Sequence, residues 1–410
     1  MVALRLVVLT LGVALGVFYP FISVILADLG FGPSAIGLIA SVGAIGFTLA
    51  VPAWGHLADV RLGRPRTLQL CALGAAIAVG LMALPLPAVV IALLFIAFWI
   101  FESAWQPLAD ALTVNAVDSR SYAPIRALAS LSFAVGAIVA GFVYDATGYG
   151  GAFVAFVIGA IAMAIAARSV PDVGRAVLHD DRDRSSGPPL GRWAALLGSS
   201  GVALRLAPRL GLILVAVSLL HVGIISGFTF LPLRIGEIGG QPSDVALAAG
   251  LSAAAEIPSM LLAARVARRI GLRGMFVGSA LIYSGAIASW IVLDFPAGII
   301  ATRAFTGIAF AGTVVSVVLT VAALLPPRLQ ATGQSLYQTV AFGLAAIVAN
   351  IVGGMLYDAF GHEAVFGLGT AVALAAAIIG WWAFPRDAQR PTERPAERPA
   401  SPSAVPDGGI

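Results

Sequence analysis

The stretch Gly141-Phe-Val-Tyr-Asp-Ala-Thr-Gly148 returns, with few changes, as Gly354-Met-Leu-Tyr-Asp-Ala-Phe-Gly361. Each copy ends a long apolar run, and the shift between the copies is close to half of the 410-residue chain. A second, weaker match relates the basic segment around Gly63 to the one around Gly271. Because matched features stand at matched positions, we infer that the chain consists of two related halves.

The composition excludes a water-soluble domain. Hydrophobic residues make up 60% of the chain and charged residues only 11%, whereas soluble domains carry about 25% charged residues. So much apolar surface cannot be buried in one soluble core, but lipid can solvate it. The 46 glycines suit close helix packing in a bilayer, where small residues let backbones approach.

Apolar stretches of about 20 residues, the length that crosses the hydrocarbon core, recur along the chain. Apolar and polar residues do not alternate with a period of two, the pattern that is typical of a β-barrel. We therefore predict an all-α integral membrane protein with twelve transmembrane helices in two pseudo-symmetric six-helix bundles. The predicted spans are 6–26, 35–57, 67–85, 88–114, 124–144, 150–168, 209–231, 244–264, 275–293, 297–325, 331–356 and 364–384.

The polar segments divide the chain into domains. We predict an N-terminal bundle over residues 1–168, a charged cytoplasmic linker over 169–208, a C-terminal bundle over 209–384 and a disordered cytoplasmic tail over 385–410. The tail repeats Arg-Pro-x-Glu and is rich in proline, a composition typical of disorder. Within the linker, Gly191–Leu206 is a candidate for a short interfacial helix.

Arginine sets the expected orientation. All 24 basic residues are arginine, and 22 of them fall in segments on the side of the N-terminus. Arg234 alone falls on the opposite side, and Arg303 lies within a span. By the positive-inside rule both termini are cytoplasmic, in a multi-pass protein of the cell (plasma or inner) membrane. The same distribution explains the net charge of +4 without a nucleic-acid partner.

One loop resembles a family signature. The segment from Gly55 to Arg66 contains Asp59, Gly63 and Arg64, and it resembles the signature that the major facilitator superfamily carries between its second and third spans. Here the spacing from aspartate to glycine is one residue longer, and valine replaces the first basic residue. The resemblance covers about residues 1–384 and implies two six-helix bundles that rock around a central site.

A narrower resemblance concerns the lactose-permease-like branch, especially its phenylpropionate-permease-like members. It rests on residues 106–112, 122–130 and 256–258. That branch contains mostly proton-coupled importers of aromatic acids, sugars and nucleosides. The fifth span, in residues 132–141, lacks the Gly-Pro pattern that is typical of drug–proton antiporters of the superfamily. This absence favours uptake over efflux.

The fourth span carries a polar stripe. Glu102, Gln106 and Asp110 are spaced four residues apart on one helix face, with Trp99 close to that face. A carboxyl group buried in a membrane is costly when charged, so Glu102 is our first candidate for proton coupling. Gln106 and Trp99 are candidates for binding substrate. The alternative for Glu102 is a hydrogen-bonded structural carboxylate.

A gate is predicted near the cytoplasmic side. Asp110 lies at the depth of Arg126, which opens the fifth span. An ion pair between them would hold the inner gate closed and break during transport. The alternative is that Arg126 is a plain interfacial arginine under the positive-inside rule.

Two charges in the second half are further candidates. Glu256, on the eighth span, is the second candidate for carrying the proton. Arg303 lies deep in the tenth span, and its planar guanidinium suits an anionic substrate such as a carboxylate. The alternative is a structural ion pair between Glu256 and Arg303 that binds no ligand.

Four uncharged side chains complete the candidate substrate site: His221 on the seventh span, Gln334 and Gln338 on the eleventh, and Tyr19 on the first. For His221 and Tyr19, core packing is the competing interpretation.

These features predict a secondary active transporter that takes up a small organic solute together with protons. Proton-driven efflux of lipophilic compounds is the first alternative, and a non-transporting receptor or membrane enzyme is the second. The chain has no lysine for a phosphate-binding loop and no Cys/His cluster with metal spacing. We therefore predict no enzyme activity, no cofactor and no metal. The expected partners are the solute, protons and membrane lipid, and we expect a monomer.

Overall fold

The structure, a computed structural model, describes residues 2–116, 119–171 and 200–386, and within these ranges it contains helices and no strand. Eleven of the described helical segments are long and apolar enough to cross a membrane. One of them, α11 (Pro242–Val292), has 51 residues and is interrupted by a non-helical Gly271, so it comprises two spans. The resulting twelve spans confirm the predicted all-α membrane fold.

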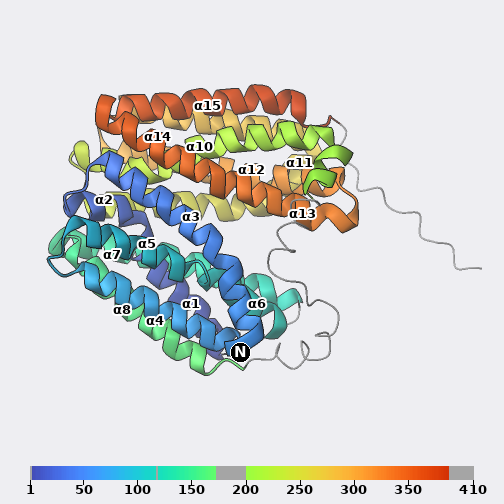
Figure 1. The fold of residues 1–410 in the computed structure, drawn as a ribbon. Helices are drawn as coiled ribbons and strands as arrows, with labels where there is room; N and C mark the ends of the chain where they lie inside the picture. Colours follow the sequence, from blue (N-terminus) through green and yellow to red (C-terminus); the bar gives the residue numbers. More distant parts are fainter. Residues whose placement is uncertain (1, 117–118, 172–199, 387–410) are drawn as a thin grey trace, which may run out of the picture.

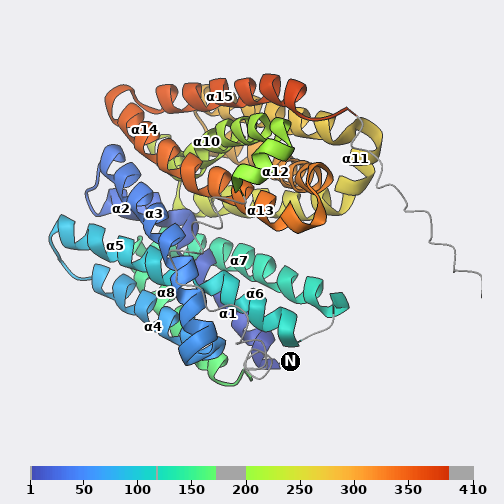
Figure 2. The same ribbon diagram turned by 45° about the vertical axis from the view of Figure 1, so that its right-hand side comes forward.

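Two groups of helices lie side by side (Figures 1 and 2). The first group consists of α1 (Val2–Gly16), η1 (Tyr19–Phe21), α2 (Ile22–Asp28), α3 (Pro33–Leu57), η2 (Ala58–Leu62), α4 (Arg64–Met82), α5 (Ala88–Glu102), α6 (Trp105–Ala116), α7 (Ser119–Thr147) and α8 (Gly150–Arg168). The second group consists of α10 (Pro208–Glu237), α11, α12 (Pro296–Leu324), α13 (Pro327–Gln338), η5 (Thr339–Leu344), α14 (Ala345–Phe360) and α15 (His362–Ala383).

The predicted linker and tail are described only in part. Within the candidate interfacial helix Gly191–Leu206, residues 200–206 are helical. The remainder of that candidate, like most of the linker and of the tail, lies outside the described residues. The boundaries of the two bundles stay a prediction.

The first and fourth spans are not the continuous helices that we expected. The first is interrupted between α1 and α2, and the fourth at Ser103 and Ala104. The cause is proline, whose ring clashes with the carbonyl group four residues earlier and which lacks an N–H. Pro20 acts in this way on Gly16, and Pro107 acts on Ser103.

Side chains bind the carbonyl groups that these interruptions leave free. The Tyr144 hydroxyl donates to the Val17 carbonyl at 2.8 Å. In the fourth span, the Trp54 indole donates to the Ile100 carbonyl at 2.8 Å, and the Ser103 hydroxyl donates to the same oxygen. Buried backbone acceptors in a membrane need such partners, so both interruptions are stabilised features of the fold.

The weaker internal repeat has a structural counterpart. Gly63, between η2 and α4, has a φ of 82°, and Gly271, inside α11, has a φ of 75°. Each lies at the turn between the second and third spans of its half. Because only glycine adopts this backbone conformation freely, the repeated glycine marks the same turn in both halves.

The two groups meet at what we call the distal end, where α3 and α11 begin and α7 and α14 end. The Ser41 hydroxyl of α3 donates to the Ile347 carbonyl of α14 at 3.1 Å. Gly37 lies so close that any side chain there would overlap the carbonyl oxygen of Asn350. On the other side of the molecule, Gly141 of α7 packs against Ala246 of α11. The distal end is therefore closed by direct helix contacts.

Candidate functional site

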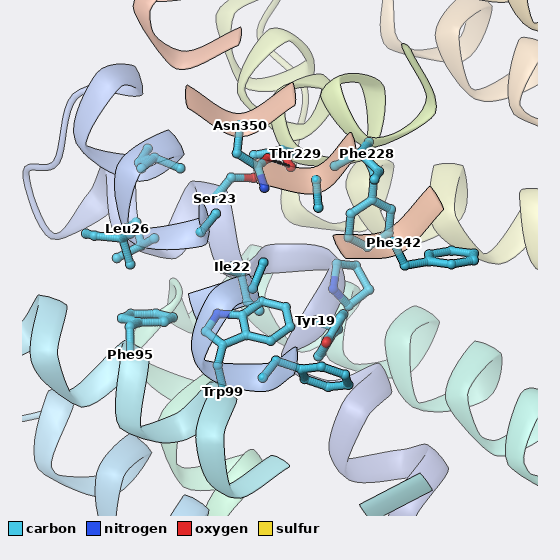
Figure 3. A pocket seen from close by; sticks show the side chains of 18 of the residues that line it. Tyr19, Ile22, Ser23, Leu26, Phe95, Trp99, Phe228, Thr229, Phe342 and Asn350 are labelled. Carbon is cyan, nitrogen blue, oxygen red and sulfur yellow. Dashed lines mark hydrogen bonds between the residues drawn. The ribbon is translucent and has the colours of Figure 1, made fainter. Parts of the chain in front are cut away.

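A cavity of about 270 Å³ lies between the two groups of helices, and we call it the aromatic cavity (Figure 3). One wall comes from η1, α2, α3 and α5, and the other from α10, η5 and α14. Its aromatic side chains are Tyr19, Phe47, Phe95, Trp99, Phe228 and Phe342, and its polar aliphatic ones are Ser23, Thr48, Thr229 and Asn350. The rest of the lining is aliphatic, and no lining side chain is charged.

Aromatic rings from both groups form the centre of this cavity. The Tyr19 and Trp99 rings meet edge to face, with centroids 5.2 Å apart. Phe228, from α10, lies 6.5 Å from Tyr19, and Phe47 lies 6.3 Å from Trp99. Tyr19 stands at the interruption of the first span, so the irregular backbone places it between the two groups. Both predicted residues, Tyr19 and Trp99, thus line the cavity.

Glu102 lies next to this cavity, one helical turn beyond Trp99. It is 5% exposed, and its Oε2 is buried without a hydrogen-bond partner among the described residues. The Tyr19 hydroxyl is close enough to interact electrostatically with it. A charged carboxylate in such surroundings is costly unless it is paired. Protonation of the Glu102 carboxyl would remove this cost.

A second cavity, of about 300 Å³, joins residues that the sequence places far apart. Gln106 of α6 and Glu256 of α11 both line it. Gln106 also lines a small recess together with Asp110 and Thr113. Glu102 does not line either space. Pro107 interrupts the span between Glu102 and the other two residues, so a single helix face shared by all three stays a prediction.

Arg303 and Glu256 share one neighbour, Tyr283, which interacts electrostatically with both. The Arg303 guanidinium donates to the Thr306 hydroxyl at 3.0 Å and lies 5.9 Å from the centre of the Trp290 ring. Arg303 does not line the aromatic cavity. Its position suits a polar network inside the second group of helices.

The other uncharged candidates have different surroundings. His221 is fully buried, with Nδ1 2.9 Å from the Val217 carbonyl oxygen and its ring 5.0 Å from the Phe342 ring. Its Nε2 has no partner among the described residues. Gln334 donates to the Val318 carbonyl at 3.0 Å, which ties α13 to α12. Gln338 is exposed at the end of α13.

The structure describes the predicted signature loop, but it describes the predicted gate only in part. Asp110 lies on α6, but the side chain of Arg126 lies outside the described residues, so the gate stays a prediction. In the signature loop, Asp59 Oδ1 lies 3.4 Å from Arg64 Nε. Gly63 supplies the positive φ that begins α4, and Gly55 has open space around it.

Sequence reasoning missed the polar wall of the aromatic cavity. The Thr229 hydroxyl of α10 donates to Asn350 Oδ1 of α14 at 2.7 Å. Asn350 is an amide inside an apolar span, the same signal that singled out Gln334. Its importance becomes visible only when α10, α14 and α3 are placed together.

Comparisons with known proteins agree with this architecture. A family model described as the MFS_1 like family matches residues 3–368. A maltose permease of Geobacillus stearothermophilus is 29% identical over 360 residues, which are 86% of each protein. A variant of the nucleoside transporter NupG superposes with a TM-score of 0.80 at 17% identity, over 94% of this chain and 99% of that chain. A D-xylose-proton symporter reaches 0.67 at 15% identity, over 94% and 97%.

Proposed function

Because the chain belongs to the MFS_1-like family and is a multi-pass membrane transporter of the major facilitator superfamily, we propose that it couples uptake of a small organic solute to proton entry. The observation that carries this proposal is the position of Tyr19, which lines the aromatic cavity and interacts electrostatically with the buried Glu102. Solute and proton would thus meet at one side chain. The narrower resemblance to the lactose-permease-like branch stays a prediction.

The proposed cycle uses alternating access. In the proposed orientation, with both termini cytoplasmic in the cell membrane, the distal end would face outward and its helix contacts would close the outer side. Separation of these contacts would admit solute to the aromatic cavity and a proton to Glu102. Closure would then release both to the cytoplasm. Glu256, beside Gln106 in the second cavity, is the alternative proton carrier on the release path, where the Asp110–Arg126 gate is proposed.

Efflux of lipophilic compounds is a second candidate, because the lining of the aromatic cavity has no charge and few polar groups. The two functions differ in the direction of coupled movement. In the uptake mode solute and proton move together, and in the efflux mode they move in opposite directions.

The test is proton movement in liposomes that contain the purified protein and a pH dye. Aromatic acids, sugars, nucleosides and lipophilic cations are added in turn. We expect one class to drive proton entry, and we expect Glu102→Gln to abolish that entry while unlabelled-for-labelled solute exchange persists. Glu363→Gln, at an exposed carboxyl in the first turn of α15, is the matched control.

Other results would redirect the proposal. Proton entry that survives in Glu102→Gln and disappears in Glu256→Gln moves the coupling role to Glu256. Proton exit driven by lipophilic cations establishes efflux. If no solute moves in any variant, the coupled-transport proposal is wrong.

A further inference from the structure

We propose that the aromatic cavity selects an uncharged, largely apolar solute that has a planar ring and a carbonyl-type hydrogen-bond acceptor. The side-chain amide of Asn350 donates a hydrogen bond to this acceptor. The inference rests on the proposed transport function, because it names the substrate class of the same site. It excludes carboxylates and sugars as the preferred solutes, although the maltose permease is similar in sequence.

Charge is the first argument. No cationic side chain lines the cavity, and Arg303, the arginine predicted to bind an anion, packs against Trp290 and Thr306. A carboxylate that entered the cavity would lose its hydration without gaining a counter-ion. Moving a charged group from water into a protein interior without a partner of opposite charge has a very high free-energy cost. An uncharged solute avoids this cost.

Ring geometry is the second argument. Tyr19 and Trp99 come from one half of the chain, and Phe228 and Phe342 from the other. Aromatic side chains prefer edge-to-face and offset contacts with other rings. At about 270 Å³ the cavity is smaller than most drug-binding pockets, which begin at roughly 300 Å³. A single planar ring with a short substituent suits this space.

The polar wall is the third argument. The Thr229 hydroxyl occupies Asn350 Oδ1 at 2.7 Å, and the Nδ2 of Asn350 has no hydrogen-bond partner among the described residues. The amide N–H groups of Asn350 are therefore free to donate to a ligand from this wall of the cavity. Figure 3 shows Asn350 and Thr229 on one wall of the cavity and Trp99 and Tyr19 on the opposite one. A ring against Trp99 would direct its substituent toward Asn350.

The small number of polar groups argues against sugars. A disaccharide carries eight hydroxyl groups, and each one buried without a partner weakens binding roughly tenfold or more. Besides Tyr19 and Trp99, the cavity offers the side-chain polar groups of Ser23, Thr48, Thr229 and Asn350. Two of these four already bind each other.

Asn350 also links recognition to closure. Its backbone carbonyl packs against Gly37 of α3 at the distal end, and its side chain lines the cavity. A solute that hydrogen-bonds to this side chain therefore contacts the helix that completes the closed state. Substrates lacking an acceptor would bind without this link.

The test is calorimetric binding to the purified full-length protein in detergent. The probes are 3-phenylpropionamide and 3-phenylpropionate, which share a ring and a length and differ in charge, together with maltose. We expect the amide to bind at least 30-fold more tightly than the carboxylate, and maltose to bind more weakly than the amide. Asn350→Ala should weaken amide binding about tenfold, which corresponds to the loss of one hydrogen bond.

Two further variants separate binding from folding. Thr229→Val keeps the shape of the wall and removes the hydroxyl that orients Asn350, so we expect a loss of about threefold. Gln69→Ala removes an amide on α4, remote from the cavity, and should leave binding unchanged. Equal melting temperatures of these proteins would show that the losses are local.

The outcomes distinguish this inference from the proposed function. Amide binding that depends on Asn350, without coupled proton entry in liposomes, supports the substrate class and refutes coupled transport. Coupled uptake of 3-phenylpropionate or maltose, together with weak amide binding, overturns the substrate class and leaves coupled transport standing. Absence of amide binding altogether also overturns the inference.

Discussion

The carboxylate of Asp145, at the end of α7, accepts a hydrogen bond of 2.9 Å from the backbone N–H of Ser243, in the first turn of α11. Asp358 occupies the same position in the second copy of the repeat. Its Oδ1 lies 3.7 Å from where a Cβ would stand on Gly32, the N-cap of α3. Each repeated aspartate therefore faces the N-terminus of a helix in the opposite half, where a negative charge is favourable.

Asp145→Asn should weaken closure of the distal end. Asparagine can still accept the hydrogen bond but loses the charge, which is worth about 1 kcal/mol at a helix N-terminus. We expect the closed population to fall relative to the open one by roughly fivefold. Nitroxide labels on cysteines that replace the exposed Ala27 and Phe360, with Cys71 changed to serine, would report the distance between the halves. Glu363→Gln is the control, and an unchanged distance distribution in Asp145→Asn would show that the charge contributes nothing.

Gly37→Val should prevent the distal end from closing. Any side chain at Gly37 would overlap the Asn350 carbonyl oxygen and approach Gly354, so the closed state loses its closest helix contact. We expect solute uptake in liposomes to fall at least tenfold. Gly278→Val is the matched control, since a Cβ there would meet open space. Similar activity in both variants would contradict the packing argument.

Gly63→Ala should lower the thermal stability of the protein. Gly63 has a φ of 82° and a ψ of 156°, a backbone conformation that is essentially restricted to glycine and costs another residue about 1–3 kcal/mol. Gly55→Ala, which adds the same methyl group in open space, is the control. A melting curve in detergent that is the same for both variants would contradict this account.

Arg234→Gln should also be destabilising, although the sequence singled Arg234 out only for its side of the membrane. Its guanidinium is 8% exposed and lies 2.6 Å from Asp294 Oδ1 and 3.8 Å from Glu237 Oε2. Loss of a charged hydrogen bond costs about 2 kcal/mol. Thermal unfolding in detergent measures the effect, with the exposed Arg66→Gln as control. Equal melting points would show that water replaces these contacts.

The number and extent of the spans could be predicted because hydropathy is averaged over a window of about 20 residues. A local irregularity in the helix changes this average little. The same averaging hides the interruptions at Pro20 and Pro107, which determine where Tyr19 and Glu102 lie. The aromatic cavity needs side chains from both halves, among them Phe228 and Asn350. The lining of the cavity depends on how helices from both halves pack, and no fixed residue spacing in the sequence predicts that packing. Tyr19 and Trp99 were predictable because polar aromatic residues stand out within apolar spans.

Tyr19→Phe tests whether coupling passes through the Tyr19 hydroxyl, which interacts electrostatically with Glu102. Phenylalanine keeps the ring contacts with Trp99 and Phe228 and removes only the group that interacts with the carboxyl. We expect solute exchange to persist and the number of protons that enter per solute to fall by at least half.

The matched control is Tyr149→Phe, which removes a hydroxyl at the start of α8, outside the cavity. An unchanged number of protons per solute in Tyr19→Phe would instead assign Tyr19 to solute binding alone and leave Glu102 to respond to the solute by another route.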